Sequence, residues 1–258
     1  MTAPLLFITG ASSGIGQALA LAWARRGGRL ALVARRGDEM QAWVEAQGWG
    51  PERAAVYVAD VCDVTALTAA GRACIAAQGL PEAVIASAGI SVGVDTAIES
   101  DLEVTRRVLE TNNLGMAATF QPFVAPMRER RGGRLVGIAS VAGFRGLPGH
   151  AAYSQSKAGV IAYCESLRVE CRPFGVRVVT IAPGYIDTPL TRHNKYSMPF
   201  LMPADEFAER ALDAIAAGAA LRVIPWQMGV LARILRLLPN WLYDRLLVGR
   251  ARKARQAS

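Results

Sequence analysis

The stretch Leu5-Leu-Phe-Ile-Thr-Gly-Ala-Ser-Ser-Gly-Ile-Gly16 decides the fold of this chain. Its first four residues are apolar and predict a short buried strand, and the alanine- and leucine-rich run after it predicts a helix. Three glycines, Gly10, Gly14 and Gly16, lie between strand and helix. Such a turn lets the backbone approach a pyrophosphate, which the helix N-terminus attracts through unpaired N–H groups and its dipole. The spacing G-x-x-x-G-x-G differs from the general fingerprint G-x-G-x-x-G, so the interpretation needs support from the rest of the chain.

Strand-like and helix-like segments alternate along the remainder of the 258 residues. This alternation predicts an α/β fold of the Rossmann type: a doubly wound, seven-stranded parallel sheet flanked by helices, in a single domain. We expect a catalytic domain over residues 1–226 and a helical extension over residues 227–258. The further strands are expected at 30–34, 54–58, 83–86, 134–140, 176–182 and 221–224. The further helices are expected at 38–47, 64–77, 101–131 and 151–174, the third of them bent by asparagines at 112 and 113.

Composition narrows the class of protein. Hydrophobic residues make up 52% and charged residues 19%, which is typical of a globular chain. The four cysteines form no C-x-x-C pair, so no metal site is expected, and reduced thiols fit a cytoplasmic protein without a signal peptide. The net charge is +8, but residues 228–258 contribute +6 of it, which argues against nucleic-acid binding by the rest of the chain.

Two arginines follow the second predicted strand. An NAD-binding unit carries an acidic residue near this point, about 20 residues past the glycines, to hold the ribose 2′-hydroxyl. Here the strand ends at Ala34 and is followed by Arg35 and Arg36. Guanidinium groups pair with a 2′-phosphate, whereas a carboxylate repels it, so NADP(H) is predicted over NAD(H). The alternative is that both arginines begin a solvated helix.

A tyrosine and a lysine four residues apart form the second decisive pattern. Tyr153 and Lys157 fall on one face of a predicted helix. A phenol with a pKa near 10 is a poor acid at neutral pH, and a nearby ammonium lowers that pKa. Ser140 ends the fifth predicted strand, at the sheet edge where such folds bind ligands, and its hydroxyl suits a substrate carbonyl oxygen.

Together these residues resemble the short-chain dehydrogenase/reductase family, in its one-domain classical branch. The resemblance runs from about residue 5 to 189 and continues less specifically to 224. Thr9-Gly-Ala-Ser-Ser-Gly-Ile-Gly16 matches the family's cofactor loop, Asn112 its Asn-x-x-Gly motif, and Pro183-Gly184 with Thr188 its nicotinamide loop. One turn departs from the family pattern: Ala86-Ser-Ala-Gly89 stands where the family has Asn-Asn-Ala-Gly, which removes two asparagine side chains but no catalytic residue.

The resemblance implies a mechanism and a set of contacts. Tyr153 would donate the proton as hydride reaches the carbonyl, Lys157 would lower the tyrosine pKa and bind the ribose, and Ser140 would polarise the carbonyl. Asn112 would hold a water that relays protons to Lys157. A homodimer or homotetramer through the two long helices is implied as well. The cofactor contacts expected by this resemblance are Gly10, Ser12, Ser13, Gly14, Ile15, Gly16, Arg35, Arg36, Asp60, Val61, Ala88, Gly89, Tyr153, Lys157, Pro183, Gly184, Ile186 and Thr188.

The segment after Pro183 is expected to cover the substrate. It is mostly apolar, which favours a hydrophobic carbonyl compound, although the same side chains would also suit packing against the body. His150 and His193 are expected in loops rather than in catalysis. The expected lining residues are Tyr185, Leu190, Tyr196, Met198, Phe200, Leu201 and Met202, joined by Phe144, Leu147 and His150.

The C-terminal extension is unusual. Residues 229–238 predict an amphipathic helix, Pro239 interrupts it, and residues 241–255 predict a second, basic helix. Its charges and Pro239 argue against a membrane-spanning helix. Three roles stay open for it: peripheral contact with an anionic membrane, packing on a partner subunit, and covering the substrate cleft.

Two other functions use the same scaffold. One is a related lyase, epimerase or isomerase, although this length disfavours the larger sugar-nucleotide epimerases. The other is a non-enzymatic NADP(H)-binding sensor, which has no need of a proton donor such as Tyr153. The sequence leaves the substrate and the direction of reaction open.

Overall fold

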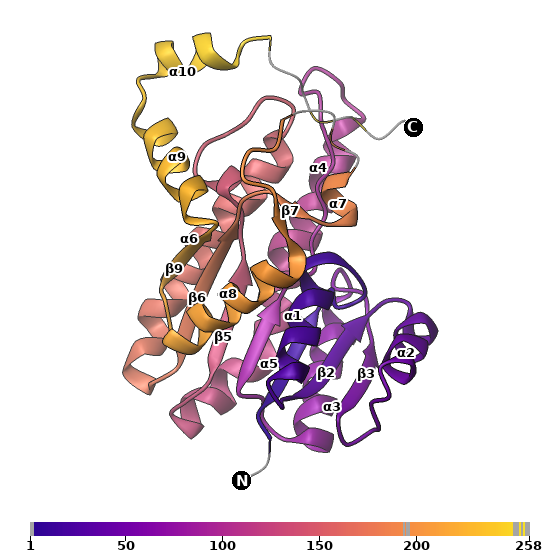
Figure 1. Ribbon diagram of the computed structural model, residues 1–258. Helices are drawn as coiled ribbons and strands as arrows, with labels where there is room; N and C mark the ends of the chain where they lie inside the picture. The colour runs from indigo at the N-terminus through magenta and orange to yellow at the C-terminus, as the bar shows by residue number, and fades with distance from the viewer. Residues whose placement is uncertain (1–2, 193, 195–196, 250–252, 254, 256–258) are drawn as a thin grey trace.

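A single parallel sheet of seven strands forms the centre of the computed structural model, which describes residues 3–192, 194, 197–249, 253 and 255 (Figure 1). Its strand order is β3-β2-β1-β4-β5-β6-β9, with every neighbouring pair parallel. This confirms the predicted doubly wound α/β fold. The strands are β1 (Leu5–Thr9), β2 (Arg29–Ala34), β3 (Ala54–Val58), β4 (Ala83–Ala86), β5 (Arg134–Ile138), β6 (Arg177–Pro183) and β9 (Leu221–Ile224).

The chain reverses its winding direction between β1 and β4. From β1 it runs outward through β2 to β3, then returns to place β4 on the other side of β1 and continues outward to β9. The crevice outside the carboxyl ends of the strands at such a switch point is where this architecture binds ligands.

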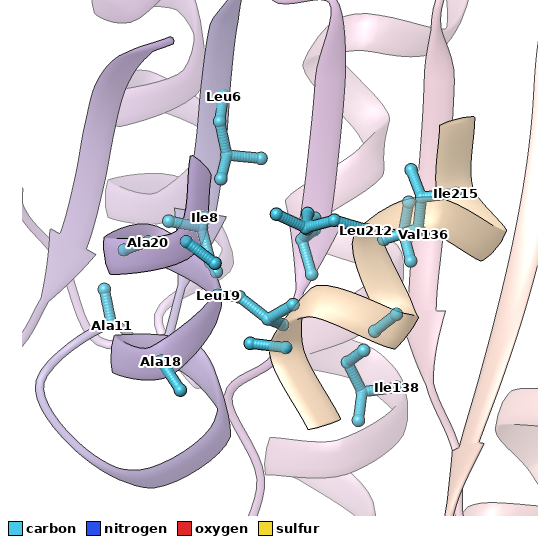
Figure 2. Packing of buried hydrophobic residues seen from close by; sticks show 14 of the residues in the cluster. Leu6, Ile8, Ala11, Ala18, Leu19, Ala20, Val136, Ile138, Leu212 and Ile215 are labelled. Atoms are coloured by element: carbon cyan, nitrogen blue, oxygen red, sulfur yellow. The ribbon is translucent and has the colours of Figure 1, made fainter. Parts of the chain in front are cut away.

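Both faces of the sheet are covered, which is why its central strands are apolar without alternation. On β1, Leu6 and Ile8 enter one hydrophobic cluster, and Leu5 and Phe7 enter the other. Figure 2 shows the first cluster, where Leu19 and Leu212 from two helices meet the side chains of β1 and β5. The helices that cover the sheet are α1 (Gly14–Arg25), α2 (Gly37–Ala46), α3 (Val64–Gln78), α5 (Gly115–Arg130), α6 (Ala151–Cys171) and α8 (Ala204–Ala217).

The long helix predicted over residues 101–131 is divided in two. α4 (Asp101–Leu109) and α5 are joined by one π-helical turn, Glu110–Leu114, which contains both asparagines. The side chains of these asparagines bond to other segments and not to the backbone of their own helix. Asn112 bonds to Ile90 and Ser156, and Asn113 Nδ2 donates to the backbone carbonyl of Ser156 at 2.8 Å.

Other predicted ends need small corrections. β5 ends at Ile138 because Ser140 already begins a 3₁₀ turn, Val141–Gly143, accepting a hydrogen bond from the Ala142 N–H. α6 ends at Cys171 and is followed by a 3₁₀ turn, Arg172–Phe174, with Pro173 inside it. Two short strands, β7 (Ile186–Asp187) and β8 (Met202–Pro203), pair with each other, and α7 (Pro189–Arg192) follows β7.

Two helices follow β9 and form an arm at the carboxyl edge of the sheet (Figure 1). α9 (Trp226–Leu237) begins one residue before the predicted extension, and α10 (Asn240–Leu247) follows Pro239. The second predicted helix was wrong beyond Leu247: Val248 and Gly249 form a turn, and Arg255 makes an isolated bridge to Gly93. Within the described part of the chain, none of the helices is both long and apolar enough to cross a bilayer.

Candidate active site

A cavity of about 890 Å³ lies along the carboxyl ends of the strands. All the residues predicted to be catalytic or to contact the cofactor line it, with the exception of Asn112. Side chains that are far apart in sequence, such as Arg35, Ser140 and Thr188, therefore share one cleft.

The glycine turn at one wall of the cavity is shaped for close backbone approach. Gly10 and Gly14 have φ angles of +70° and +56°, a conformation that side chains disfavour. A Cβ atom at Gly16 would lie 2.2 Å from the Gly10 carbonyl oxygen, so no larger residue fits. The side chain of Ser13, at the N-cap of α1, makes no capping hydrogen bond there, which leaves the first N–H groups of the helix for a ligand. This turn therefore fits a pyrophosphate.

Two arginines and an aspartate lie at another part of the cavity. Arg35 directly follows β2, and its Nη1 atom is 3.6 Å from Asp60 Oδ2. Arg36 Nη1 is 2.8 Å from Glu39 Oε2 on α2. Asp60 also accepts a hydrogen bond from the Cys62 N–H at 3.0 Å, and the N-cap of α3 is Asp63 instead, so Asp60 does not cap that helix. Both guanidinium groups are exposed and fit a phosphate ester in place of a ribose hydroxyl.

Ser140, Tyr153 and Lys157 come together through the packing of α6 against the end of β5. Lys157 is buried, and its ammonium donates to the Ile138 carbonyl at 2.8 Å while lying 5.7 Å from the Tyr153 ring centroid. Burial lowers the pKa of Lys157 to about 8. Burial also raises the pKa of Tyr153, a change that a hydrogen bond with Ser140 opposes. The resemblance implied that Lys157 would lower the pKa of Tyr153. In the structure this pKa is raised, because desolvation of the phenol outweighs the other effects.

Asn112 lies behind the cavity wall. Its Oδ1 accepts from the Ile90 N–H at 2.8 Å, and its Nδ2 donates to the Ile90 carbonyl at 3.0 Å and to Ser156 Oγ at 2.9 Å. A Cβ atom at Gly89 would lie 3.2 Å from Asn112 Oδ1 and 3.5 Å from Lys157 Nζ. Asn112 therefore ties the segment after β4 to α6, and Gly89 lies close to both its amide oxygen and the Lys157 ammonium.

The structure adds lining residues that the sequence patterns did not select. Arg107, Glu110 and Thr111 reach the cavity from α4 and the π-helical turn. Their i, i+3 and i+4 spacing was the available signal, although many solvated helix faces share it. The other added residues are Val33, Ala34, Ala59, Cys62, Ser87, Ile90, Val92, Ile138, Ala139, Pro189, Leu190 and Thr191, of which Leu190 was expected as substrate lining.

The remaining residues expected around the substrate have varied surroundings. Met202 is buried in the sheet's hydrophobic cluster, and its N–H donates to the Tyr185 carbonyl at 3.0 Å. His150 is buried at the N-cap of α6, in a loop position as expected. Phe200 and Leu201 are exposed. His193 and Tyr196 lie outside the described residues.

Comparisons with known proteins agree with this geometry. The sequence model described as short chain dehydrogenase matches residues 5–198. This chain belongs to the short-chain dehydrogenase/reductase family. An uncharacterized oxidoreductase of Myxococcus xanthus is 43% identical, over 92% of this chain and 93% of that protein. An acetoacetyl-CoA reductase of an Acinetobacter strain is 32% identical, over 71% of this chain and 74% of that protein.

A solved structure extends the likeness to three dimensions. A short chain dehydrogenase from Burkholderia cenocepacia, in complex with NADP, superimposes with a TM-score of 0.81 at 26% identity, covering 95% of this chain and 98% of that one. As a short-chain dehydrogenase/reductase, the protein is an oxidoreductase that uses a nicotinamide dinucleotide and a small-molecule substrate.

Proposed function

We propose that this short-chain dehydrogenase/reductase uses NADPH to reduce a hydrophobic ketone or aldehyde, with Tyr153 as the general acid. The observation that carries the proposal is the shared cavity: Ser140, Tyr153 and Lys157 line the same cleft as the glycine turn and Arg35. A protein that only sensed the cofactor would need the turn and the arginine, but not a half-buried phenol beside a serine hydroxyl.

The chain's own residues account for the proton. The Ser140 hydroxyl acts to lower the pKa of the Tyr153 phenol and lines the same cavity, so both groups are available to one carbonyl oxygen. Ser140 holds that oxygen while Tyr153 donates its proton to it. The buried Lys157 ammonium stabilises the phenolate that remains. The dinucleotide, when bound, supplies the hydride that the carbonyl carbon receives.

The preference for NADPH is assigned to Arg35 and Arg36. β2 ends at Ala34 without the acidic residue that would hold a ribose 2′-hydroxyl. Arg35 has only a 3.6 Å contact with Asp60, whereas Arg36 has a 2.8 Å ion pair with Glu39. Arg35 is therefore the guanidinium that moves more readily to a 2′-phosphate. The Burkholderia cenocepacia relative solved with NADP supports this choice.

A 3-oxoacyl, steroid-like or lipid-like carbonyl compound fits the cavity lining. Ile90, Val92 and Leu190 contribute apolar side chains to it. The relative named acetoacetyl-CoA reductase and a 3-oxoacyl-[acyl-carrier protein] reductase from Brucella melitensis, 27% identical with a TM-score of 0.75, support ketone reduction as the reaction.

The assembly is proposed to be a homodimer or homotetramer in the cytoplasm. The helices that hold Asn112 and Tyr153 expose large apolar side chains, which favours their burial between subunits. All four cysteines are free thiols, in agreement with a reducing compartment. The exposed residues are Leu102, Leu114, Tyr163 and Val169.

Oxidation of NADPH against a panel of carbonyl compounds tests the proposed function. The panel should contain short aldehydes, cyclic ketones, steroids and 3-oxoacyl thioesters, with NADH measured in parallel. We expect turnover of an apolar ketone with NADPH and much less with NADH. Turnover that favours NADH would refute the assignment of the arginines. Tight NADPH binding without turnover of any compound would favour the sensor.

A further inference from the structure

The helix α9 carries apolar side chains on two opposite faces. Its inner face, with Met228 and Ala232, is buried against the body. Its outer face presents Trp226, Val230 and Ile234, whose i, i+4 and i+8 spacing forms a stripe along the helix. A helix that is apolar on both sides is normally covered on both sides. The outer stripe is exposed to solvent, so it lacks the cover that the inner face has.

The exposed stripe continues onto α10. Leu237, at the end of α9, is 84% exposed, Trp241 is 69% exposed and Val248 is 79% exposed. Leu246 adds a fourth large apolar side chain. We call the exposed residues Trp226, Val230, Ile234, Leu237, Trp241, Leu246 and Val248 the apolar ridge. Scattered exposed apolar residues are common on protein surfaces, but seven along one short arm form a contact surface.

The body holds this arm in a fixed position. The Arg145 guanidinium donates to the Leu238 carbonyl at 2.8 Å and to Asn240 Oδ1 at 3.0 Å, and lies 3.8 Å from the Tyr243 ring centroid. Arg236 donates to the Phe144 carbonyl at 2.7 Å from the other side. These bonds fix both helices to the loop after Ser140. They therefore hold the apolar ridge on the outer side of the arm.

The charges beside the apolar ridge indicate what covers it. Arg233 and Arg245 are exposed, and residues 226–249 hold three arginines against the single acid Asp244. A surface that combines tryptophan, long aliphatic side chains and arginine suits the interface of a bilayer, where the apolar groups enter the acyl boundary and the cations meet anionic headgroups. A second copy of this arm would instead bring arginines of like charge together.

We propose that the α9–α10 arm docks this protein on the surface of an anionic lipid bilayer through the apolar ridge. Because α9 directly follows β9, the arm lies at the carboxyl edge of the sheet, the same edge that carries the cavity. The bilayer surface would then lie near the substrate entrance, which suits a carbonyl compound dissolved in lipid. That last step rests on the proposed function; the docking itself does not.

Flotation of the full chain with vesicles tests the docking without measuring turnover, so its outcome is separate from that of the carbonyl assay. Vesicles of phosphatidylcholine should be compared with vesicles of two parts phosphatidylcholine to one part phosphatidylglycerol. We expect flotation with the anionic vesicles, little with the neutral ones, and loss in high salt, since each arginine contributes about fivefold to binding. Absence of flotation with anionic vesicles would overturn the proposal.

Matched variants identify the surface. Leu237→Ser with Trp241→Ser should reduce flotation at least tenfold, whereas Val58→Ser with Val64→Ser, which removes exposed apolar side chains from β3 and α3, should not. If the two double variants float equally well, the arm is not the docking surface. A different result would show that a second copy covers the apolar ridge. In that case the wild type does not float, and Leu237→Ser with Trp241→Ser dissociates an oligomer.

A spectroscopic measurement avoids any dependence on weakened folding. Two of the five tryptophans, Trp226 and Trp241, lie on the apolar ridge, and the other three lie in the N-terminal 49 residues. Vesicles of brominated anionic lipid should quench part of the wild-type emission. The conservative variant Trp226→Phe with Trp241→Phe should still float but lose that quenching. Quenching that persists in this variant would contradict the proposed orientation.

Discussion

Replacing Lys157 by methionine should make the protein more stable at neutral pH while removing its activity. Methionine has a similar length and no charge. Burial lowers the pKa of Lys157 from its ordinary value of 10.5 to about 8. One pKa unit corresponds to about 1.4 kcal/mol. Keeping this ammonium charged in the folded state at pH 7 therefore lowers the free energy of unfolding by about 3 kcal/mol. The hydrogen bond to the Ile138 carbonyl offsets roughly 1–2 kcal/mol of this. Lys157→Met should therefore stabilise the protein by about 1–2 kcal/mol.

The pH dependence provides a sharper signature than the magnitude. The folded-state pKa lies below the unfolded one, so the unfolded chain binds more protons between pH 8 and 10.5, and the stability of the wild type rises with pH across this window. Below pH 8 the penalty is fully present. At pH 10 it falls to about 1 kcal/mol, so the advantage of the variant should disappear there.

Urea unfolding at pH 7 and pH 10, at one fixed protein concentration, measures both effects. Arg72→Met, which removes an exposed cation from α3, is the matched control and should change stability by about 0.5 kcal/mol or less at either pH. A Lys157→Met protein that is less stable than the wild type at pH 7, or whose difference from it is the same at both pH values, would refute the reasoning.

Three further predictions concern the cavity. Tyr153→Phe should lower kcat for carbonyl reduction at least a hundredfold, because the proton donor is lost, while NADPH binding measured by fluorescence stays within a few-fold of the wild type; retained turnover would contradict the assignment. Arg35→Ser should raise KM for NADPH about 10- to 100-fold with little effect on KM for NADH, because a charge-assisted pair with the 2′-phosphate is lost. Arg36→Ser should raise KM for NADPH by less. Equal losses with both dinucleotides would argue against 2′-phosphate recognition. Gly16→Ala should destabilise the protein by about 1–3 kcal/mol in urea unfolding, because the new Cβ would lie 2.2 Å from the Gly10 carbonyl oxygen; unchanged stability would contradict that geometry.

Local sequence patterns were sufficient for the sheet and for most of the site. The central strands are short apolar runs because both faces of each are buried, and this requirement is readable residue by residue. The glycine turn is equally local, since a positive φ or a close backbone contact at Gly10 and Gly16 excludes other residues. Tyr153 and Lys157 are neighbours on one helix, so their pairing follows from helical spacing alone.

Only the tertiary structure decided the properties that depend on distant partners. The π-helical turn at Glu110–Leu114 was predicted as a bend, but its asparagines bond to Ile90 and Ser156, which no local pattern connects to them. The pKa of Tyr153 is raised rather than lowered because its desolvation depends on everything packed around it. The arm is fixed by Arg145, about 90 residues away along the chain, which is why its outward ridge could not be assigned from helical periodicity. Sequence determines what neighbours on one strand or helix require, whereas burial and charge at a site are summed over segments that only folding brings together.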